Sequence, residues 1–119
     1  MNPIWTKLLT FLLIFLGEGL AIYAELIATK NHNISSQPFL QAFLKMFPLA
    51  IVAGGLLIAG YILGYKSFKN IWIVSALSIT SILIIEPILD YTLFSQLPTK
   101  GAFVGLILGV IGFIVTLIY

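Results

Sequence analysis

The residues in this sequence that could do chemistry are its four acids, Glu18, Glu25, Glu86 and Asp90. Each acid falls inside a long apolar stretch, and none falls in a polar connection between such stretches. A carboxylate deep in a bilayer is costly, and ionisable residues at that depth usually face a bundle interior or a hydrated cavity on an ion or substrate path. We therefore interpret the four acids as candidates for binding protons and a positively charged substrate.

The spacing of the acids places them on shared helix faces. Glu18 and Glu25 are two helical turns apart and share one face, and Glu86 and Asp90, one turn apart, share another. Glu18 lies roughly 15 Å of helix from either end of its apolar stretch, too far for its short side chain to reach water. The sequence has no basic residue at comparable depth, so the acids must share protons, water or an external cation.

A buried carboxyl group that titrates near the working pH could exchange a proton for a cation, because a low dielectric disfavours its charged form. The alternative is a structural role, in which protonated or paired acids join helices through hydrogen bonds. That alternative stays open above all for Glu25 and Asp90, which lie nearer the ends of their helices.

The elements that must position these acids are membrane-spanning helices. The chain has 119 residues, of which 61% are hydrophobic and 8% charged, and its mean hydropathy is +1.14. So few polar residues cannot cover a soluble core. Continuous apolar runs without alternation favour helices over a β-barrel, and about 20 helical residues cross the hydrocarbon core. We predict an all-α, multi-pass protein of the cell membrane (inner or plasma), a single domain with four transmembrane helices at about residues 4–28, 47–65, 71–95 and 101–119.

Composition also limits the other functions of the chain. All six basic residues are scattered lysines, which argues against nucleic-acid binding, and the absence of cysteine excludes disulfides and thiolate metal sites. The single histidine, His32, falls in the polar connection 29–37, where we expect it to be solvated rather than a ligand or a base. Lys7 and the apolar run after it resemble a signal peptide, but no A-x-A-like cleavage site follows. We expect no enzymatic activity, no metal and no cofactor.

Pro87 directly follows Glu86 in the third predicted helix. A proline removes one helical hydrogen bond and frees a carbonyl one turn earlier, here near Leu83. Such a kink beside a buried acid can open a small polar cavity, although a simple packing bend is the alternative. The candidates for lining that cavity are Tyr23, Ser75, Ser78, Pro87 and Tyr91. The hydroxyl residues Ser75, Ser78, Thr80 and Ser81 are candidates either for polar cavity lining or for hydrogen bonds between helices.

Glycines recur at helical spacing in the second and fourth predicted helices. Gly60 and Gly64 are four residues apart, and Gly101, Gly105 and Gly109 form successive G-x-x-x-G steps. Small residues at this spacing let helix backbones approach closely in lipid. The pattern predicts that neighbouring helices pack closely against the glycine-bearing faces of the second and fourth helices.

The lysines are divided evenly between the two sides of the membrane. With four spans, one side carries Lys7, Lys66 and Lys69, and the other carries Lys30, Lys45 and Lys100. The positive-inside rule therefore favours neither orientation. Our hypothesis is dual topology, in which copies insert both ways and pair as an antiparallel homodimer; the alternative is that another feature sets a single topology.

The stretch "LFSQLPTKGAFVGLILGVIGF", residues 93–113, contains an aromatic-x-Gln turn followed by a G-x-x-L-x-x-x-G motif. Together with the first-helix glutamate and the evenly spread lysines, it resembles the small multidrug resistance family of the drug/metabolite transporter superfamily. The similarity covers the third and fourth helices and the centre of the first. It implies a proton-coupled antiporter that works as a two-fold dimer, in which protons and a small cationic substrate compete for Glu18. The implied dimer packing residues are Gly105, Leu108, Gly109 and Gly112.

The sequence also departs from that family. The family's third helix usually carries a Tyr and a Trp near its start, where this sequence has Ser75 and Ser78. The pair Glu86–Pro87 and the acid Asp90 are not features of the family either.

Three functional hypotheses follow. The first is a proton-coupled exporter of small cationic or amphipathic compounds, in which Glu18 exchanges proton and substrate and Glu86 or Asp90 shapes the cavity. The second is a subunit of a lipid-linked aminosugar flippase, a relative of similar size with a glycine-rich last helix. The third is a structural or assembly subunit that does not transport and whose acids bind a partner's buried Lys or Arg.

Overall fold

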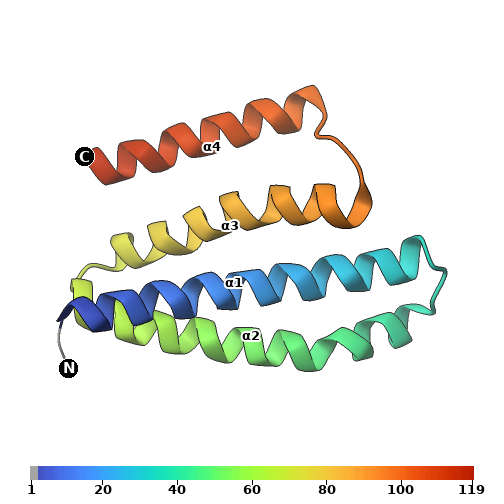
Figure 1. The fold of residues 1–119 in the computed structure, drawn as a ribbon, viewed down its shortest axis with the longest axis horizontal. Coiled ribbons are helices and arrows are strands. Elements are labelled where there is room, and N and C mark those ends of the chain that lie inside the picture. Colours follow the sequence, from blue (N-terminus) through green and yellow to red (C-terminus); the bar gives the residue numbers. More distant parts are fainter. Residues whose placement is uncertain (1–2) are drawn as a thin grey trace.

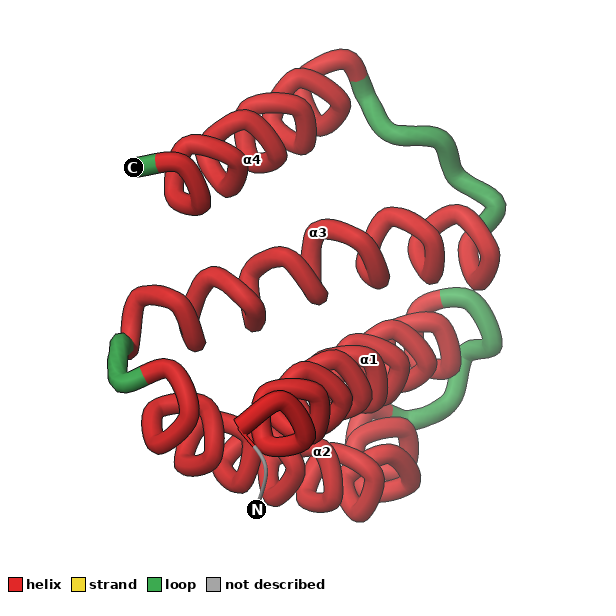
Figure 2. The backbone as a smooth tube through the Cα atoms, turned by 60° about the vertical axis from the view of Figure 1, so that its left-hand side comes forward, coloured by secondary structure: helices red, strands yellow, loops and turns green. Residues whose placement is uncertain are grey.

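The structure is a computed structural model that describes residues 3–119, and it is all-helical, as predicted (Figure 1). Its helices are α1 (Pro3–Asn33), α2 (Phe39–Phe68), α3 (Ile71–Phe94) and α4 (Lys100–Ile118). The first two helices lie side by side, α3 lies along α1, and α4 lies on the far side of α3 (Figures 1 and 2). The start of α1 and the end of α4 lie at the same end of the molecule (Figure 1).

The prediction of a membrane protein with transmembrane helices is confirmed for three of the helices. By length and composition α1, α2 and α3 can each cross a membrane, whereas α4 is a shorter apolar helix. The first two helices contain 31 and 30 residues, and a helix of that length extends for roughly 45 Å, beyond the roughly 30 Å of the hydrocarbon core. Each of these two helices is therefore longer than the hydrocarbon core is thick.

The first helix continues to Asn33, further than the expected end near Ala28, and the connection to α2 shrinks to residues 34–38. Polar side chains in this last part bond to their own helix instead of ending it. The Thr29 hydroxyl donates to the Glu25 carbonyl at 2.7 Å, and the Asn33 amide donates to the Thr29 carbonyl at 2.9 Å. Such bonds to the carbonyl four residues earlier leave the helical backbone intact.

His32 lies within α1, so its expected place in a loop was wrong. Its ring Nδ1 donates to the Gln37 carbonyl at 2.8 Å, since a carbonyl oxygen can only accept. The ring also contacts the edge of Phe39, with centroids 5.7 Å apart. His32 therefore closes the connection between α1 and α2.

The interface between α1 and α2 is the most extensive in the molecule, and glycines of α2 make it possible. A Cβ atom at Gly60 would lie 2.7 Å from Cγ1 of Ile14, and one at Gly64 would lie 2.9 Å from side-chain atoms of both Thr10 and Val74. Real Cβ atoms essentially never make contacts this short. The predicted packing role of these two glycines is confirmed.

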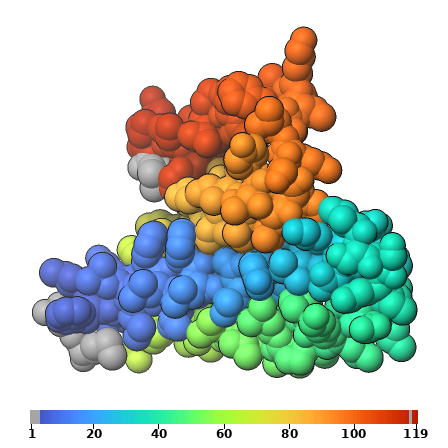
Figure 3. Space-filling view, turned by 45° about the vertical axis from the view of Figure 1, so that its right-hand side comes forward, coloured from blue at the N-terminus to red at the C-terminus, as the bar shows by residue number. Residues whose placement is uncertain are grey.

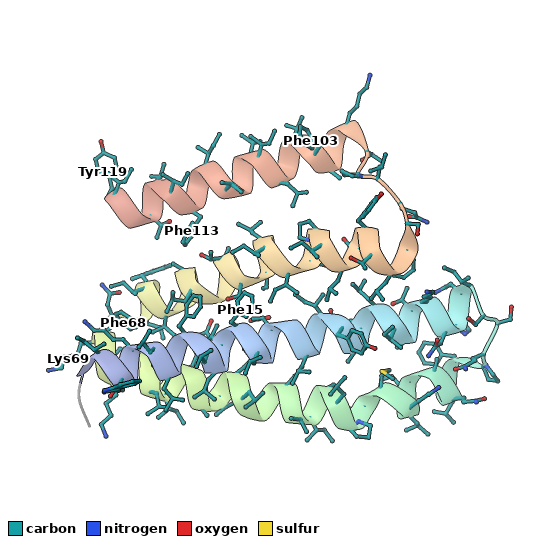
Figure 4. The ribbon with its side chains drawn as sticks, in the orientation of Figure 1. Phe15, Phe68, Lys69, Phe103, Phe113 and Tyr119 are labelled. Atoms are coloured by element: carbon teal, nitrogen blue, oxygen red, sulfur yellow. The ribbon has the colours of Figure 1, made fainter. Side chains whose placement is uncertain are left out.

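The last helix is peripheral. Within residues 3–119, α4 packs against α3 alone, and none of its described side chains is buried. Figure 4 shows Phe113 pointing from α4 toward α3 and Phe103 pointing away, and Figure 3 shows α4 standing off the layer formed by α1 and α2. Of the four glycines of α4, only Gly109 has a close neighbour: a Cβ there would lie 3.2 Å from Cδ2 of Leu83. The position of α4 thus depends on α3 and on the connection between them.

Candidate functional site

Glu18 makes a direct contact between α1 and α3. The hydroxyl of Ser78 donates a short hydrogen bond, 2.5 Å long, to Oε1 of Glu18. Ser78 is only 6% exposed, and Glu18 is partly buried. The carboxyl group of Glu18 is therefore directed to the α1–α3 interface.

Two glycines flank Glu18 and allow neighbouring helices to approach it. A Cβ at Gly17 would lie 2.8 Å from Cγ of Leu57 on α2, and one at Gly19 would lie 3.5 Å from Cδ1 of Ile85 on α3. The sequence Gly-Glu-Gly thus places a carboxyl group where three helices meet. Our reading of the sequence missed the role of Gly17 and Gly19, although small residues on both sides of an intramembrane acid were visible in it.

The other three acids form a separate group further along the same two helices. Glu86 is partly buried on α3 and experiences electrostatic repulsion from Asp90 on its own helix and from Glu25 on α1. Glu25 and Asp90 are exposed. The structure therefore divides the acids into Glu18, bonded to Ser78, and a cluster of Glu25, Glu86 and Asp90.

None of the four carboxyl groups forms an ion pair with a basic side chain among residues 3–119. The lysines lie at the helix ends and in the connections. Lys7, for example, places its ammonium group 5.3 Å from the ring centroid of Phe68, near the end of α2. The positive charge that would neutralise the acids is thus not supplied by the described part of the chain.

A cavity of about 580 Å³ lies between α3 and α4, beside the connection that joins them. Its polar lining comes from Glu86, Asp90, Tyr91 and Gln96, and its apolar lining comes from Ile82, Leu83, Pro87, Phe94, Leu97, Pro98, Ala102, Gly105 and Leu106. Two of the predicted lining residues, Pro87 and Tyr91, are thus found in its wall. Tyr23, Ser75 and Ser78 do not line it, and neither do Glu18 and Glu25.

The hydroxyl groups of α3 serve different purposes. Thr80 donates to the Ala76 carbonyl at 2.6 Å, and Ser81 donates to the Leu77 carbonyl at 2.9 Å. Both bonds stay within the helix, so these two residues do not make the contacts between helices that were one of their expected roles. Ser78 does make such a contact.

The four residues implied in dimer packing lie in different surroundings. Gly109 contacts Leu83 within the chain, and Gly105 lines the cavity. Leu108 is 62% exposed, and a Cβ at Gly112 would have nothing within 4 Å. Leu108 and Gly112 therefore lie on the open surface of α4.

The candidate site thus has two parts, the Glu18–Ser78 contact and the cavity beside Glu86 and Asp90. The chain matches no protein-family model, no curated protein and no solved structure.

Proposed function

We propose that this chain is a proton-coupled membrane transporter that exports small cationic or amphipathic compounds, similar to the small multidrug resistance family. In this proposal Glu18 is the carboxyl group that takes up and releases the proton. The observation that carries the proposal is the position of Glu18, partly buried between α1 and α3 without a basic partner in residues 3–119. A carboxylate in that place needs a proton or a mobile cation to balance its charge.

Ser78 suits both protonation states of Glu18. A serine hydroxyl is one donor and also an acceptor with two lone pairs. It donates to Glu18 when the carboxyl group is charged, and it can accept the carboxyl proton when the group is neutral. Glu18 can therefore change its charge without losing its hydrogen-bond partner.

The transporter is proposed to cross the cell membrane (inner or plasma) four times and to work as an antiparallel homodimer. An even number of spans agrees with the common end of the molecule where α1 starts and α4 finishes (Figure 1). The even division of lysines supports insertion in both orientations. Leu108 and Gly112 on the open surface of α4 are the proposed packing residues of the dimer.

The test is Glu18→Gln in purified protein reconstituted into liposomes. Proton movement driven by a gradient of tetraphenylphosphonium, followed with an internal pH-sensitive dye, is expected to fall to the level of protein-free liposomes. The variant should still insert and elute at the size of the wild-type protein. Glu25→Gln is the matched control, because Glu25 lies on the same helix face but is exposed, and it is expected to retain most of the transport.

Two results would contradict the proposal. Proton-coupled transport that persists in Glu18→Gln would remove Glu18 from the mechanism. Co-purification of the chain with one fixed partner, without proton movement on addition of cations, would instead assign the acids to assembly.

A further inference from the structure

We infer that the proton and the cation bind at different carboxyl groups: the proton at Glu18, and the cation in the α3–α4 cavity beside Glu86 and Asp90. This inference rests on the proposed function and specifies where its substrate binds. It also differs from the family resemblance, which implies that protons and substrate compete for Glu18 itself.

Glu18 and the α3–α4 cavity lie apart from each other. Glu18 does not line the cavity, and its carboxyl group is bonded to Ser78. Glu86, which does line the cavity, is eight residues after Ser78 on α3, so the two positions are about 12 Å apart along the helix axis. A cation in the cavity next to Glu86 is therefore not in contact with the carboxyl group of Glu18.

The size and the lining of the cavity suit a small organic cation. A volume of about 580 Å³ lies within the range of pockets that bind small organic ligands. Two aromatic residues, Tyr91 and Phe94, line the cavity together with Glu86 and Asp90. Aromatic rings attract a cation to their faces, and apolar walls suit the hydrocarbon part of an amphipathic ligand.

The kind of cation follows from the same lining. Among residues 3–119, no three His, Cys, Asp or Glu side chains lie close enough together to hold a metal ion, the cluster of Glu25, Glu86 and Asp90 included. Two carboxyl groups and two aromatic rings in a mostly apolar wall instead suit an organic ammonium ion, whose charge is spread over an apolar surface. The cavity also lies at the end of α3 and α4 where residues 95–99 connect them, so a ligand can reach it from the membrane surface.

The negative charges around Glu86 favour a bound cation. Glu86 is repelled by Asp90 and, across the helix interface, by Glu25. A positive charge next to Glu86 relieves this repulsion, because opposite charges stabilise the ionised form of a carboxyl group. The cluster therefore gains from a bound cation, whereas Glu18 already has a hydrogen-bond partner in Ser78.

The experiment measures binding at equilibrium, without transport. Isothermal titration calorimetry with benzyltrimethylammonium is performed on detergent-purified wild-type protein and on four variants. Glu86→Gln and Asp90→Asn are each expected to weaken binding at least about tenfold, since each removes one of the two carboxylates that balance the ligand's charge. Glu18→Gln is expected to bind within about threefold of wild type, since it removes no contact to the ligand. Glu25→Gln, which changes the repulsion but not the cavity wall, is expected to fall between them.

A second pair of variants tests the cavity without changing charge. A Cβ at Gly105 or at Gly101 meets nothing within 4 Å, so either position accepts a side chain, but only Gly105 lines the cavity. Gly105→Leu is expected to abolish measurable binding by filling the space, and Gly101→Leu, which lies outside the proposed dimer contact, is expected to leave it unchanged. Both proteins should elute as wild type does.

The inference is overturned if Glu18→Gln loses binding while Glu86→Gln and Asp90→Asn keep it, or if wild-type protein does not bind the probe. Equal binding by Gly105→Leu and wild type would also contradict it. These outcomes differ from failure of the proposed function, which would appear as proton-coupled transport in Glu18→Gln regardless of where the cation binds.

Discussion

Ser78 on α3 donates a hydrogen bond to Glu18 on α1, and this bond joins two residues that are sixty positions apart in the chain. Sequence spacing places each residue on a helix, but only the packing of α3 along α1 brings them together. The bond links the protonation of a single carboxyl group to the contact between two helices.

Ser78→Ala removes this donor and leaves the partly buried Glu18 without a hydrogen bond. Because this bond holds the Glu18 carboxyl group at the α1–α3 interface, its loss removes about 1 kcal/mol of interaction and should lower the rate of proton-coupled transport about fivefold. The measurement is the initial rate of transport in liposomes. Ser81→Ala is the control, because the Ser81 hydroxyl bonds only within its own helix. An unchanged rate in Ser78→Ala would show that the bond does not contribute to transport.

Gly64→Ala should destabilise the protein, because the new methyl group would lie 2.9 Å from atoms of Thr10 and Val74. Overpacking of this kind costs about 1–3 kcal/mol, and the midpoint of thermal unfolding in detergent, followed by circular dichroism, should fall. In the control Gly55→Ala the added methyl group has nothing within 4 Å, so its midpoint should stay at or above that of wild type. Equal midpoints for both variants would contradict the tight packing of α2.

The contact of α4 with α3 can be tested by cross-linking, since the chain has no native cysteine. Leu83→Cys combined with Gly109→Cys places two thiols where a Cβ at Gly109 would lie 3.2 Å from Leu83, and an oxidant should join them within one chain. In the control pair, Leu83→Cys with Gly101→Cys, the second position has no neighbour within 4 Å and should cross-link poorly. Cross-linked dimers from the first pair would place α4 against another copy.

The even division of lysines predicts insertion in both orientations. A single cysteine introduced by Tyr119→Cys should react with a membrane-impermeant thiol reagent in about half of the molecules in intact cells and in the remainder after lysis. Adding lysine at Gln37, in the connection between α1 and α2, should shift the ratio toward one side. Labelling of all molecules from one side in Tyr119→Cys without the added lysine would rule out dual topology.

Much of the fold could be predicted from the sequence because long apolar runs leave few alternatives to helices in a membrane. The extension of α1 to Asn33 could not, because it depends on Thr29 and Asn33 bonding back to the helix instead of ending it. The role of His32 depends on the path of residues 34–38, which brings the Gln37 carbonyl to its ring.

The candidate site was predictable in its acids but not in its arrangement. Intramembrane carboxyl groups stand out in a hydropathy pattern, and their spacing predicted a shared face of α3 for Glu86 and Asp90, both of which line the cavity. The sequence could not show that Glu18 lies outside that cavity, because helical periodicity does not determine which helices become neighbours. It also grouped Ser78 with Thr80 and Ser81, and only the packing distinguishes the hydroxyl that reaches Glu18.

The close contact of α1 with α2 has a consequence for how the protein is made. These two helices share the most extensive interface and are joined by residues 34–38 alone, so we expect the nascent chain to form this hairpin while α3 is still inside the ribosome. At that stage Glu18 does not yet have its hydrogen bond from Ser78. Biogenesis would then pass through an intermediate whose unsatisfied acid recruits α3 as it emerges, and the residue proposed to move protons in the finished protein would first guide its assembly.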